Sequence, residues 1–167
     1  DSKMKSIGNF SFDQSKVKKL TIPDNIELSE YWCSGTKNLN EIQLIPKNEE
    51  KCLMFDEVLF CGKDLIFAPR NIGDKNKIKD IINKNSINNI RSYAFEFCCN
   101  LTVLAIDSPE IKIGDFCFSN ASSLYSLEIR SQNVKIGNEC FKKCINLNIF
   151  TIRTNNKSEL SIAELGS

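Results

Sequence analysis

The stretch IGDFCFSNASSLYSLEI, from Ile113 to Ile129, decides the fold because it is one of three successive copies of the same pattern. The copy before it is IRSYAFEFCCNLTVLAI, residues 90–106, and the copy after it is IGNECFKKCINLNIFTI, residues 136–152. The central aromatic residues of the three copies are 23 residues apart: Phe95, Phe118 and Phe141. A fixed period of this length indicates a repeat protein, in which copies of one small unit stack on each other.

Two weaker copies begin the chain. The first copy, residues 7–22, is IGNFSFDQSKVKKLTI, with Phe12 in the phenylalanine column. The second copy, residues 26–44, is IELSEYWCSGTKNLNEIQL, and Trp32 takes that place either as a larger buried anchor or as an exposed binding residue. We therefore divide the chain, as a single domain over residues 1–167, into repeats and an insert with approximate bounds. The repeats are 1–22, 23–44, 81–106, 107–129 and 130–152, with a β-hairpin insert at 52–69 and a partial repeat at 153–167.

Each unit ends in an aliphatic trio with the spacing L-x-x-L-x-I, as in Leu124, Leu127 and Ile129. The last two members are two residues apart, which is the spacing of side chains on one face of a strand. Each unit is thus expected to add one short parallel strand. The phenylalanine segment predicts one helical turn packed on the strands, and Gly114 and Gly137 are interpreted as turn residues before that segment.

The pattern I-G-x-x-A/C-F-x-x-C-x-x-L-x-x-L-x-I resembles the leucine-rich repeats of the BspA type. The link Thr21-Ile22-Pro23 and the hairpin-like pair at 57–60 and 65–69 fit that family as well, whereas Arg91 stands where the repeat has glycine. The resemblance implies a repeat solenoid of the α+β or mainly β class. It would be a curved leucine-rich-repeat array with parallel strands on the concave face, short helical turns on the convex side and one inserted β-hairpin.

The resemblance also implies a function. BspA-like proteins are surface proteins of bacteria and parasitic protists, so the expected role is a non-enzymatic protein-binding module in adhesion or host interaction. Its partner would be a host cell-surface or extracellular-matrix protein, and its location the cell surface or the secreted fraction. The alternative is an intracellular, cytoplasmic scaffold that uses the same repeat surface, because the start of the chain, DSKMKS, lacks the apolar core of an export signal.

The amino-acid composition disfavours several kinds of functional site. The chain contains no histidine, which removes the commonest general base and every histidine-dependent nucleophile or zinc site. The formal net charge is +1, so no basic field favours nucleic acid or an anionic membrane, and no apolar run is long enough to cross a bilayer. We expect no catalytic residues, no cofactor, no metal site and no membrane insertion in this segment.

Four of the eight cysteines, Cys98, Cys117, Cys140 and Cys144, stand in two repeat columns. The residue before the phenylalanine is Ser11, Ala94, Cys117 or Cys140, and the residue three after it is also small, so cysteine is expected to be a buried filler. One alternative stays open: Cys117 and Cys140 occupy equivalent positions on adjacent repeats and could form a cross-repeat disulfide. Cys99 is expected to be exposed.

The predicted binding surface consists of outward residues that alternate with the buried trio. A mixture of charged and apolar groups without an implied deep pocket suits a protein partner better than a small molecule. These residues are Lys19, Glu41, Gln43, Val103, Asp107, Ser126, Glu128, Arg130, Ile149, Thr151 and Arg153.

Two further expectations concern the remaining segments. The stretch from Gly73 to Asn89 is rich in lysine and asparagine and is expected to be a polar loop. Both ends of the sequence interrupt a repeat, and stacked arrays are normally closed by polar capping units. We therefore expect either a longer protein or end-to-end self-association.

Overall fold

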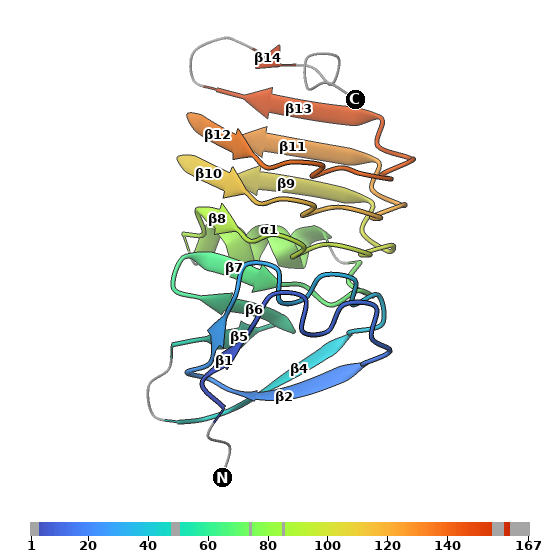
Figure 1. Ribbon diagram of the computed structural model, residues 1–167. Helices are drawn as coiled ribbons and strands as arrows, with labels where there is room; N and C mark the ends of the chain where they lie inside the picture. The colour runs from blue at the N-terminus through green and yellow to red at the C-terminus, as the bar shows by residue number, and fades with distance from the viewer. Residues whose placement is uncertain (1–3, 48–50, 74, 85, 155–158, 161–167) are drawn as a thin grey trace.

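The computed structural model describes residues 4–47, 51–73, 75–84, 86–154 and 159–160. The chain winds into a β-solenoid whose rungs stack from the N-terminal end to the C-terminal end (Figure 1). The repeat solenoid expected from the 23-residue period is confirmed.

The predicted strand of each unit is present at the L-x-x-L-x-I motif. These strands are β2 (Lys19–Pro23), β4 (Glu41–Ile45), β9 (Val103–Asp107), β11 (Ser126–Arg130) and β13 (Ile149–Arg153). They pair in parallel as β2–β4 and as β9–β11–β13, and the short β14 (Glu159–Leu160) adds to β13 in the antiparallel sense. We call the outward side of these five parallel strands the strand face.

Each unit also contributes a second strand, so the expectation of one strand per unit is wrong. The second strands are β1 (Ser6–Ile7), β3 (Glu27–Leu28), β8 (Asn89–Ile90), β10 (Glu110–Ile113) and β12 (Asn133–Ile136). In β10 the exposed Glu110 and Lys112 alternate with the buried Ile111 and Ile113, which is the pattern of a half-buried strand. The isoleucine before the glycine therefore ends a strand that packs on the same core.

The phenylalanine segments are chains of β-turns and not helical turns. Within the third copy, Tyr93 and Phe97 have positive φ, and the equivalent residues of the next two copies do as well. The reason lies in the hydrogen bonds: the N–H of Phe95 donates to the Cys117 carbonyl at 2.9 Å, on the next rung. A helix would use these N–H groups within the segment, whereas here alternate groups build a backbone ladder between rungs.

The central phenylalanines form one row inside the solenoid, as the columns predict. The rings of Phe95 and Phe118 stack at 5.1 Å between centroids, and those of Phe118 and Phe141 at 5.7 Å, each with an interplanar angle of 10°. Trp32 is buried and occupies the equivalent place in the second copy, in contact with Phe12 and Phe67. Identical spacing along the chain thus becomes parallel stacking of rings.

The repeat glycines are required by close approach and not by turn geometry. Neither Gly114 nor Gly137 has positive φ, so the turn interpretation is wrong. A Cβ on Gly114 would lie 2.4 Å from the Ser92 nitrogen, because the Gly114 N–H donates to the Ile90 carbonyl at 2.8 Å. Arg91 can stand at this position in the third copy because its neighbour on that side is β7 of the insert, to which its N–H donates.

The insert is a three-stranded meander with a disulfide, where a single hairpin is expected from the sequence. It contains β5 (Leu53–Phe55), β6 (Val58–Cys61) and β7 (Asp64–Phe67), and Cys52 is bonded to Cys61. Parallel pairing of β7 with β8 joins the meander to the second sheet, in the order β12-β10-β8-β7-β6-β5. The disulfide lies outside the repeat columns, which is why they do not reveal it.

The segment expected to be a polar loop contains the helix α1 (Lys75–Lys84), so that expectation is wrong. Ile78, Ile81 and Ile82 are spaced as one face of a helix and are fully buried. The helix packs beside β9, where the regular array would place another parallel strand (Figure 1).

The meander separates two hydrophobic cores. Within β6, Val58 and Phe60 face the core of the C-terminal rungs, whereas Leu59 faces the core of the N-terminal rungs. Burial on both faces accounts for the unbroken apolar run of this strand. We call the rungs with β1–β4 the N-terminal block and those with β8–β13 the C-terminal block.

Candidate functional site

On the C-terminal block, the strand face is built of three rows that cross β9, β11 and β13 in exact register. The first row is apolar at both ends, Val103–Ser126–Ile149, and the second is Ala105–Glu128–Thr151. The third row is charged, Asp107–Arg130–Arg153. Period-two alternation places all nine side chains outward while Leu104, Leu127 and Phe150 point into the core.

Ion pairs organise the charges of this face. One oxygen of Glu128, Oε1, lies 3.1 Å from Nε of Arg130 and 3.0 Å from Nε of Arg153. The two arginines are more than half exposed, so the pairs contribute little to stability but hold the guanidinium groups in place. The face therefore presents oriented charges at one end and apolar groups at the other.

The strand face of the N-terminal block is a separate patch. Lys19 lies opposite Glu41 in the β2–β4 register, and their side chains form an ion pair at 2.6 Å. Gln43 is exposed two residues further along β4. No hydrogen-bonded strand among the described residues joins β4 to β9, because the meander and α1 lie between the blocks. The structure thus divides the predicted residues into two groups.

At the edge of the strand face, the sequence patterns did not predict one exposed aromatic residue. Tyr125 directly precedes β11 and is 47% exposed, and its hydroxyl lies 3.1 Å from Nδ2 of Asn148, the equivalent residue of the next rung. It lies at the edge of the strand face, where β11 begins. Its column otherwise holds the polar Thr102 and Asn148, and that contrast was the available signal.

The thiols are placed as fillers. Cys33, Cys98, Cys117 and Cys140 are free and buried, while Cys99 is exposed as expected. The open alternative of a bond between Cys117 and Cys140 is not realised. Burial raises the pKa of Cys33 to about 11 and that of Cys98 to about 12, so both stay protonated and unreactive at neutral pH. Among the described residues, no group of three metal-ligating side chains comes together.

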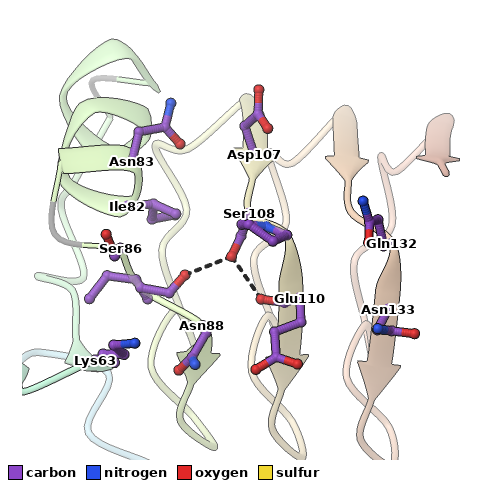
Figure 2. A pocket seen from close by; sticks show the side chains of 12 residues that line it. Lys63, Ile82, Asn83, Ser86, Asn88, Asp107, Ser108, Glu110, Gln132 and Asn133 are labelled. Carbon is purple, nitrogen blue, oxygen red and sulfur yellow. Dashed lines mark hydrogen bonds between the residues drawn. The ribbon is translucent and has the colours of Figure 1, made fainter. Parts of the chain in front are cut away.

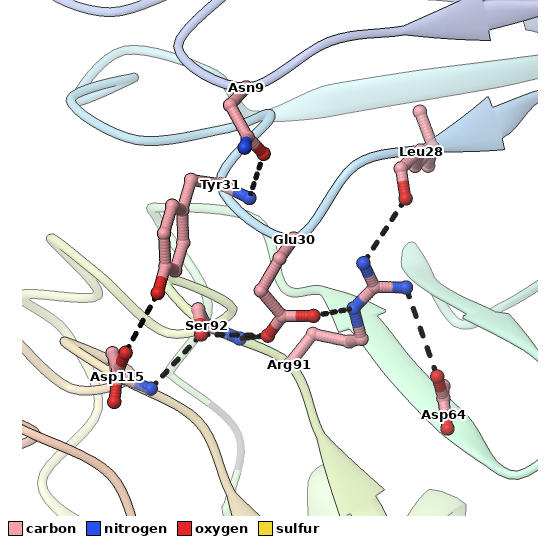
Figure 3. A network of polar contacts seen from close by, with 8 residues as sticks. All are labelled: Asn9, Leu28, Glu30, Tyr31, Asp64, Arg91, Ser92 and Asp115. Atoms are coloured by element: carbon pink, nitrogen blue, oxygen red, sulfur yellow. Dashed lines mark hydrogen bonds and ion pairs between the residues drawn. The ribbon is translucent and has the colours of Figure 1, made fainter.

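A polar network joins the N-terminal and C-terminal blocks (Figure 3). Ser92 donates from its N–H and hydroxyl to Oε1 of Glu30, at 3.0 and 2.7 Å, and Oε2 of the same carboxylate lies 2.8 Å from Nε of Arg91. The Tyr31 hydroxyl donates to Oδ2 of Asp115 at 2.8 Å. These groups are paired with one another, and their role is structural.

Arg70 is the buried centre of the junction. Its guanidinium donates to the carbonyls of Cys33 and Thr36 in the N-terminal block and to those of Tyr93 and Ala94 in the C-terminal block, at 3.0 to 3.3 Å. It also lies 4.7 Å from the centre of the Phe67 ring. A charged side chain thus replaces the backbone ladder that links regular rungs.

Glu96 lies at the same junction. Its carboxylate accepts the N–H of Gly35 at 2.9 Å. Burial raises the pKa of Glu96 to about 7, against the lowering effects of that hydrogen bond and of the Arg70 charge. The contact between the blocks therefore contains a group that titrates near neutral pH.

The chain was compared with known proteins. The family described as "BspA type Leucine rich repeat region" matches residues 1–62 and 73–161 in six copies. A crystal structure of a leucine-rich repeat protein from Eubacterium ventriosum superposes with a TM-score of 0.50 at 16% identity. That match covers 90% of this chain and 52% of the other, so the chain spans about half the length of that protein.

Two further findings complete the picture. No curated protein matches the sequence. Among the described residues, α1 is the one helix, and it is too short and too polar to cross a membrane.

The matched repeats extend over most of the chain, and the columns, the stacked rungs and the superposed solenoid agree with them. The chain belongs to the family of BspA-type leucine-rich repeat proteins.

Proposed function

We propose that this chain is a non-enzymatic module that binds a protein through its strand face. The family is one of repeat modules for protein interaction, which supports the class of function. The observation that carries the proposal is the set of three rows on β9, β11 and β13, where two arginines oriented by Glu128 lie at one end of the strands and Val103 and Ile149 lie at the other end of the same face. Oriented charges and apolar groups on one broad face suit a protein surface.

The C-terminal block is proposed as the main contact region. Its predicted contact residues are Val103, Asp107, Ser126, Glu128, Arg130, Ile149, Thr151 and Arg153, with Tyr125 added at the edge. Lys19, Glu41 and Gln43 form a second patch on the N-terminal block, which a partner would reach only by extending past the insert.

The proposal is tested by capturing partners with the wild-type chain and with a charge-reversed variant, Glu128→Lys with Arg130→Glu and Arg153→Glu. We expect capture to fall by at least about tenfold, because like charges would face each other across the interface. The matched control reverses one acid and two bases on the turn side of one rung, Glu139→Lys with Lys142→Glu and Lys143→Glu. Equal losses in both variants, or a loss in the control alone, would contradict the assignment of the strand face.

For cellular context we propose a cell-surface or secreted protein that acts in adhesion or host interaction, with a host cell-surface or matrix protein as partner. The Cys52–Cys61 disulfide supports export, because disulfides persist in oxidising compartments. The free thiols agree with this, since four of the six are buried and inaccessible to oxidants. Many family members are surface-exposed, which points the same way.

The second candidate is a cytoplasmic scaffold that uses the same surface. It is favoured by the number of free cysteines, six of eight, which is typical of a reducing compartment. Mass spectrometry of protein from its native source separates the two. An intact Cys52–Cys61 bond supports export, and fully reduced Cys52 and Cys61 would replace that proposal with the scaffold.

End-to-end self-association remains a proposal of its own. It is supported by apolar side chains on the rung formed by residues 136–152, where Ile145 is 79% exposed and Phe141 is half-buried. Light scattering over a concentration series would show a rising mass if rungs of two copies stack. A constant monomer mass would contradict it.

A further inference from the structure

The charged end of the strand face borders a hollow of about 400 Å³. The third row of the face, Asp107, Arg130 and Arg153, lies along it, next to the corner residues Ser108 and Ser131. Figure 2 shows the adjoining hollow at the same corner, which shares Asp107 and Ser108 with the first. A group of a partner can therefore enter the face at its charged end.

The backbone at this end is held by hydrogen bonds that continue from rung to rung around the corner. The N–H of Ser108 donates to the Arg130 carbonyl at 3.1 Å, and the N–H of Ser131 donates to the Arg153 carbonyl at 3.0 Å. The Ser108 hydroxyl also lies 2.7 Å from the Glu110 carbonyl oxygen (Figure 2). The charged side chains thus project from a fixed backbone, which lowers the cost of ordering them on binding.

Each arginine of the third row uses one nitrogen inside the protein. Nε of Arg130 and Nε of Arg153 both bind Oε1 of Glu128, at 3.1 and 3.0 Å. Among the side chains that the structure describes, the terminal nitrogens Nη1 and Nη2 of both guanidinium groups make no hydrogen bond or ion pair. The arginine side chains are 53% and 59% exposed and that of Glu128 is 27% exposed, so the cations are the outer groups.

The placement of the two arginines favours a carboxylate as their ligand. Arg130 and Arg153 are direct partners in the β11–β13 register, where like charges repel each other. Glu128 is one carboxylate shared by two cations, so positive charge remains in excess between these three groups. A guanidinium group binds a carboxylate through two parallel N–H···O bonds, and both arginines have the terminal nitrogens free for this.

The neighbouring Asp107 distinguishes a protein segment from a uniform polyanion. Asp107 is exposed and, among the described residues, forms no ion pair with its register partner Arg130. Glu110 points away from Asp107 and adds no charge to the row (Figure 2). A sulfated polysaccharide or a nucleic acid would bring negative charge to Asp107 as well. A protein segment can place a carboxylate over the arginines and a donor over Asp107.

The apolar end of the face sets a spacing for this segment. Val103 and Ile149 stand four residues before Asp107 and Arg153 on their strands. At about 3.3 Å per residue, the two ends of the face are about 13 Å apart. One segment reaches both ends if its acidic and apolar residues are about four positions apart when extended, or about nine positions apart when helical.

We propose that the strand face recognises an acidic segment of its protein partner. A carboxylate of the segment binds the guanidinium groups of Arg130 and Arg153, and an apolar side chain about 13 Å away contacts Val103 and Ile149. This inference rests on the proposed function and narrows it to one kind of partner. The carboxylate provides orientation, because only one end of the face can hold it.

The test is selection of peptides from a phage-displayed random library on the wild-type chain, followed by titration with the best peptide. We expect enrichment of Asp or Glu at about four or about nine positions from an apolar residue. Arg130→Gln with Arg153→Gln should bind the peptide at least about tenfold more weakly, because glutamine is neutral and lacks the guanidinium fork. Its thermal melting should equal that of wild type, because the lost ion pairs are exposed.

The matched control is Lys112→Gln with Lys135→Gln. These exposed lysines are also direct partners on neighbouring strands, in the β10–β12 register of the second sheet. The control variant should bind the peptide like wild type. Selection of no peptide, selection without acidic enrichment, tighter binding of heparin than of any peptide, or equal binding by the arginine variant and wild type would each overturn the inference.

Partner capture separates a failure of this inference from a failure of the proposed function. Capture that is lost with Glu128→Lys, Arg130→Glu and Arg153→Glu but is unchanged with Arg130→Gln and Arg153→Gln would keep the strand face as the binding surface. It would overturn only the acidic segment. Capture that is unchanged in both variants would overturn the inference together with the proposed function.

Discussion

The N-terminal and C-terminal blocks are built from the same unit but are held together differently. In the C-terminal block the period is constant at 23 residues, the phenylalanine rings stack in parallel, and the turn segments share a backbone ladder. In the N-terminal block Phe12 and Trp32 are 20 residues apart, and their rings meet edge to face. In the regular copies alternate N–H groups of each turn segment bond to the next rung, whereas the two turn segments of the N-terminal block share one such bond, from the Phe10 N–H to the Tyr31 carbonyl.

At the junction between the blocks, side chains make most of the polar contacts. No regular rung follows the second copy, so Arg70, Arg91, Glu30 and Glu96 fill the contacts that backbone groups make elsewhere. Such charged contacts require several groups to be satisfied at once. Mutations in each block test the difference between backbone-ladder and side-chain contacts.

The largest effect is expected from the aromatic row. Phe118→Ala should lower the free energy of unfolding by about 3 to 5 kcal/mol, because it leaves a cavity between two stacked rings. The matched change in the other block, Phe12→Ala, should cost about 1 to 2 kcal/mol, because Phe12 is half-buried. Urea unfolding measures both, and equal losses would contradict the difference between the blocks.

The next largest loss of stability is expected when the buried cation at the junction, Arg70, is removed. Arg70→Met is expected to cost about 3 kcal/mol, since the carbonyls of both blocks lose their donor inside the protein. Arg91→Met, at the more open edge of the junction, should cost about 1 kcal/mol or less. Chemical denaturation followed by the fluorescence of Trp32 reports on both. If Arg70→Met were as stable as wild type, the junction would be held by apolar packing alone.

The glycine columns give a smaller, sharply matched pair. Gly114→Ala should cost about 2 kcal/mol, because the new Cβ would meet the backbone of the neighbouring rung. Gly8→Ala occupies the same column in the first copy, where the nearest atom would be 3.8 Å away, and should change stability by less than about 0.5 kcal/mol. Thermal melting of the two variants decides between close approach and turn geometry, since the latter predicts similar costs.

The last prediction concerns the pH dependence of stability. Burial raises the pKa of Glu96 from the ordinary value of 4.5 to about 7 in the folded chain, so between these values the folded state binds more protons than the unfolded state. Stability should therefore fall as pH rises through this window, by on the order of 1 kcal/mol per pH unit.

Glu96→Gln stays neutral and can still accept the Gly35 N–H. It should equal wild type near pH 4 and become the more stable protein as pH rises to about 8, because wild type alone pays the cost of a buried charge. Denaturation midpoints over this pH range measure the difference. A constant difference across the range would show that Glu96 is not titrating at the junction.

The repeat columns predicted the features that recur in every copy. The L-x-x-L-x-I strands, the row of Phe95, Phe118 and Phe141 and the outward rows of the strand face all follow from spacing alone. The second strands were missed because short motifs such as EIKI read equally well as the approach to a turn. The sequence could also not show that Lys19, Glu41 and Gln43 would be separated from the other predicted contacts, because that depends on how the insert packs.

What lies outside the repeats was not predictable from them. The lysines and asparagines around α1 obscured the spacing of Ile78, Ile81 and Ile82, and Cys52 and Cys61 have no counterparts in any column. Arg70 follows the hairpin strands and has no equivalent in another copy. Its role depends on the folded arrangement, because its guanidinium donates to backbone carbonyls of both blocks.

Native-state hydrogen exchange tests most directly whether the blocks differ in how their rungs are joined. The N–H groups of Phe10 and Phe116 stand in the same column and both donate to the next rung, at 3.0 and 2.9 Å. We expect the Phe116 amide to exchange only through large unfolding of the C-terminal block and the Phe10 amide through a smaller, local opening. Equal protection of the two amides, or stronger protection of Phe10, would contradict this account.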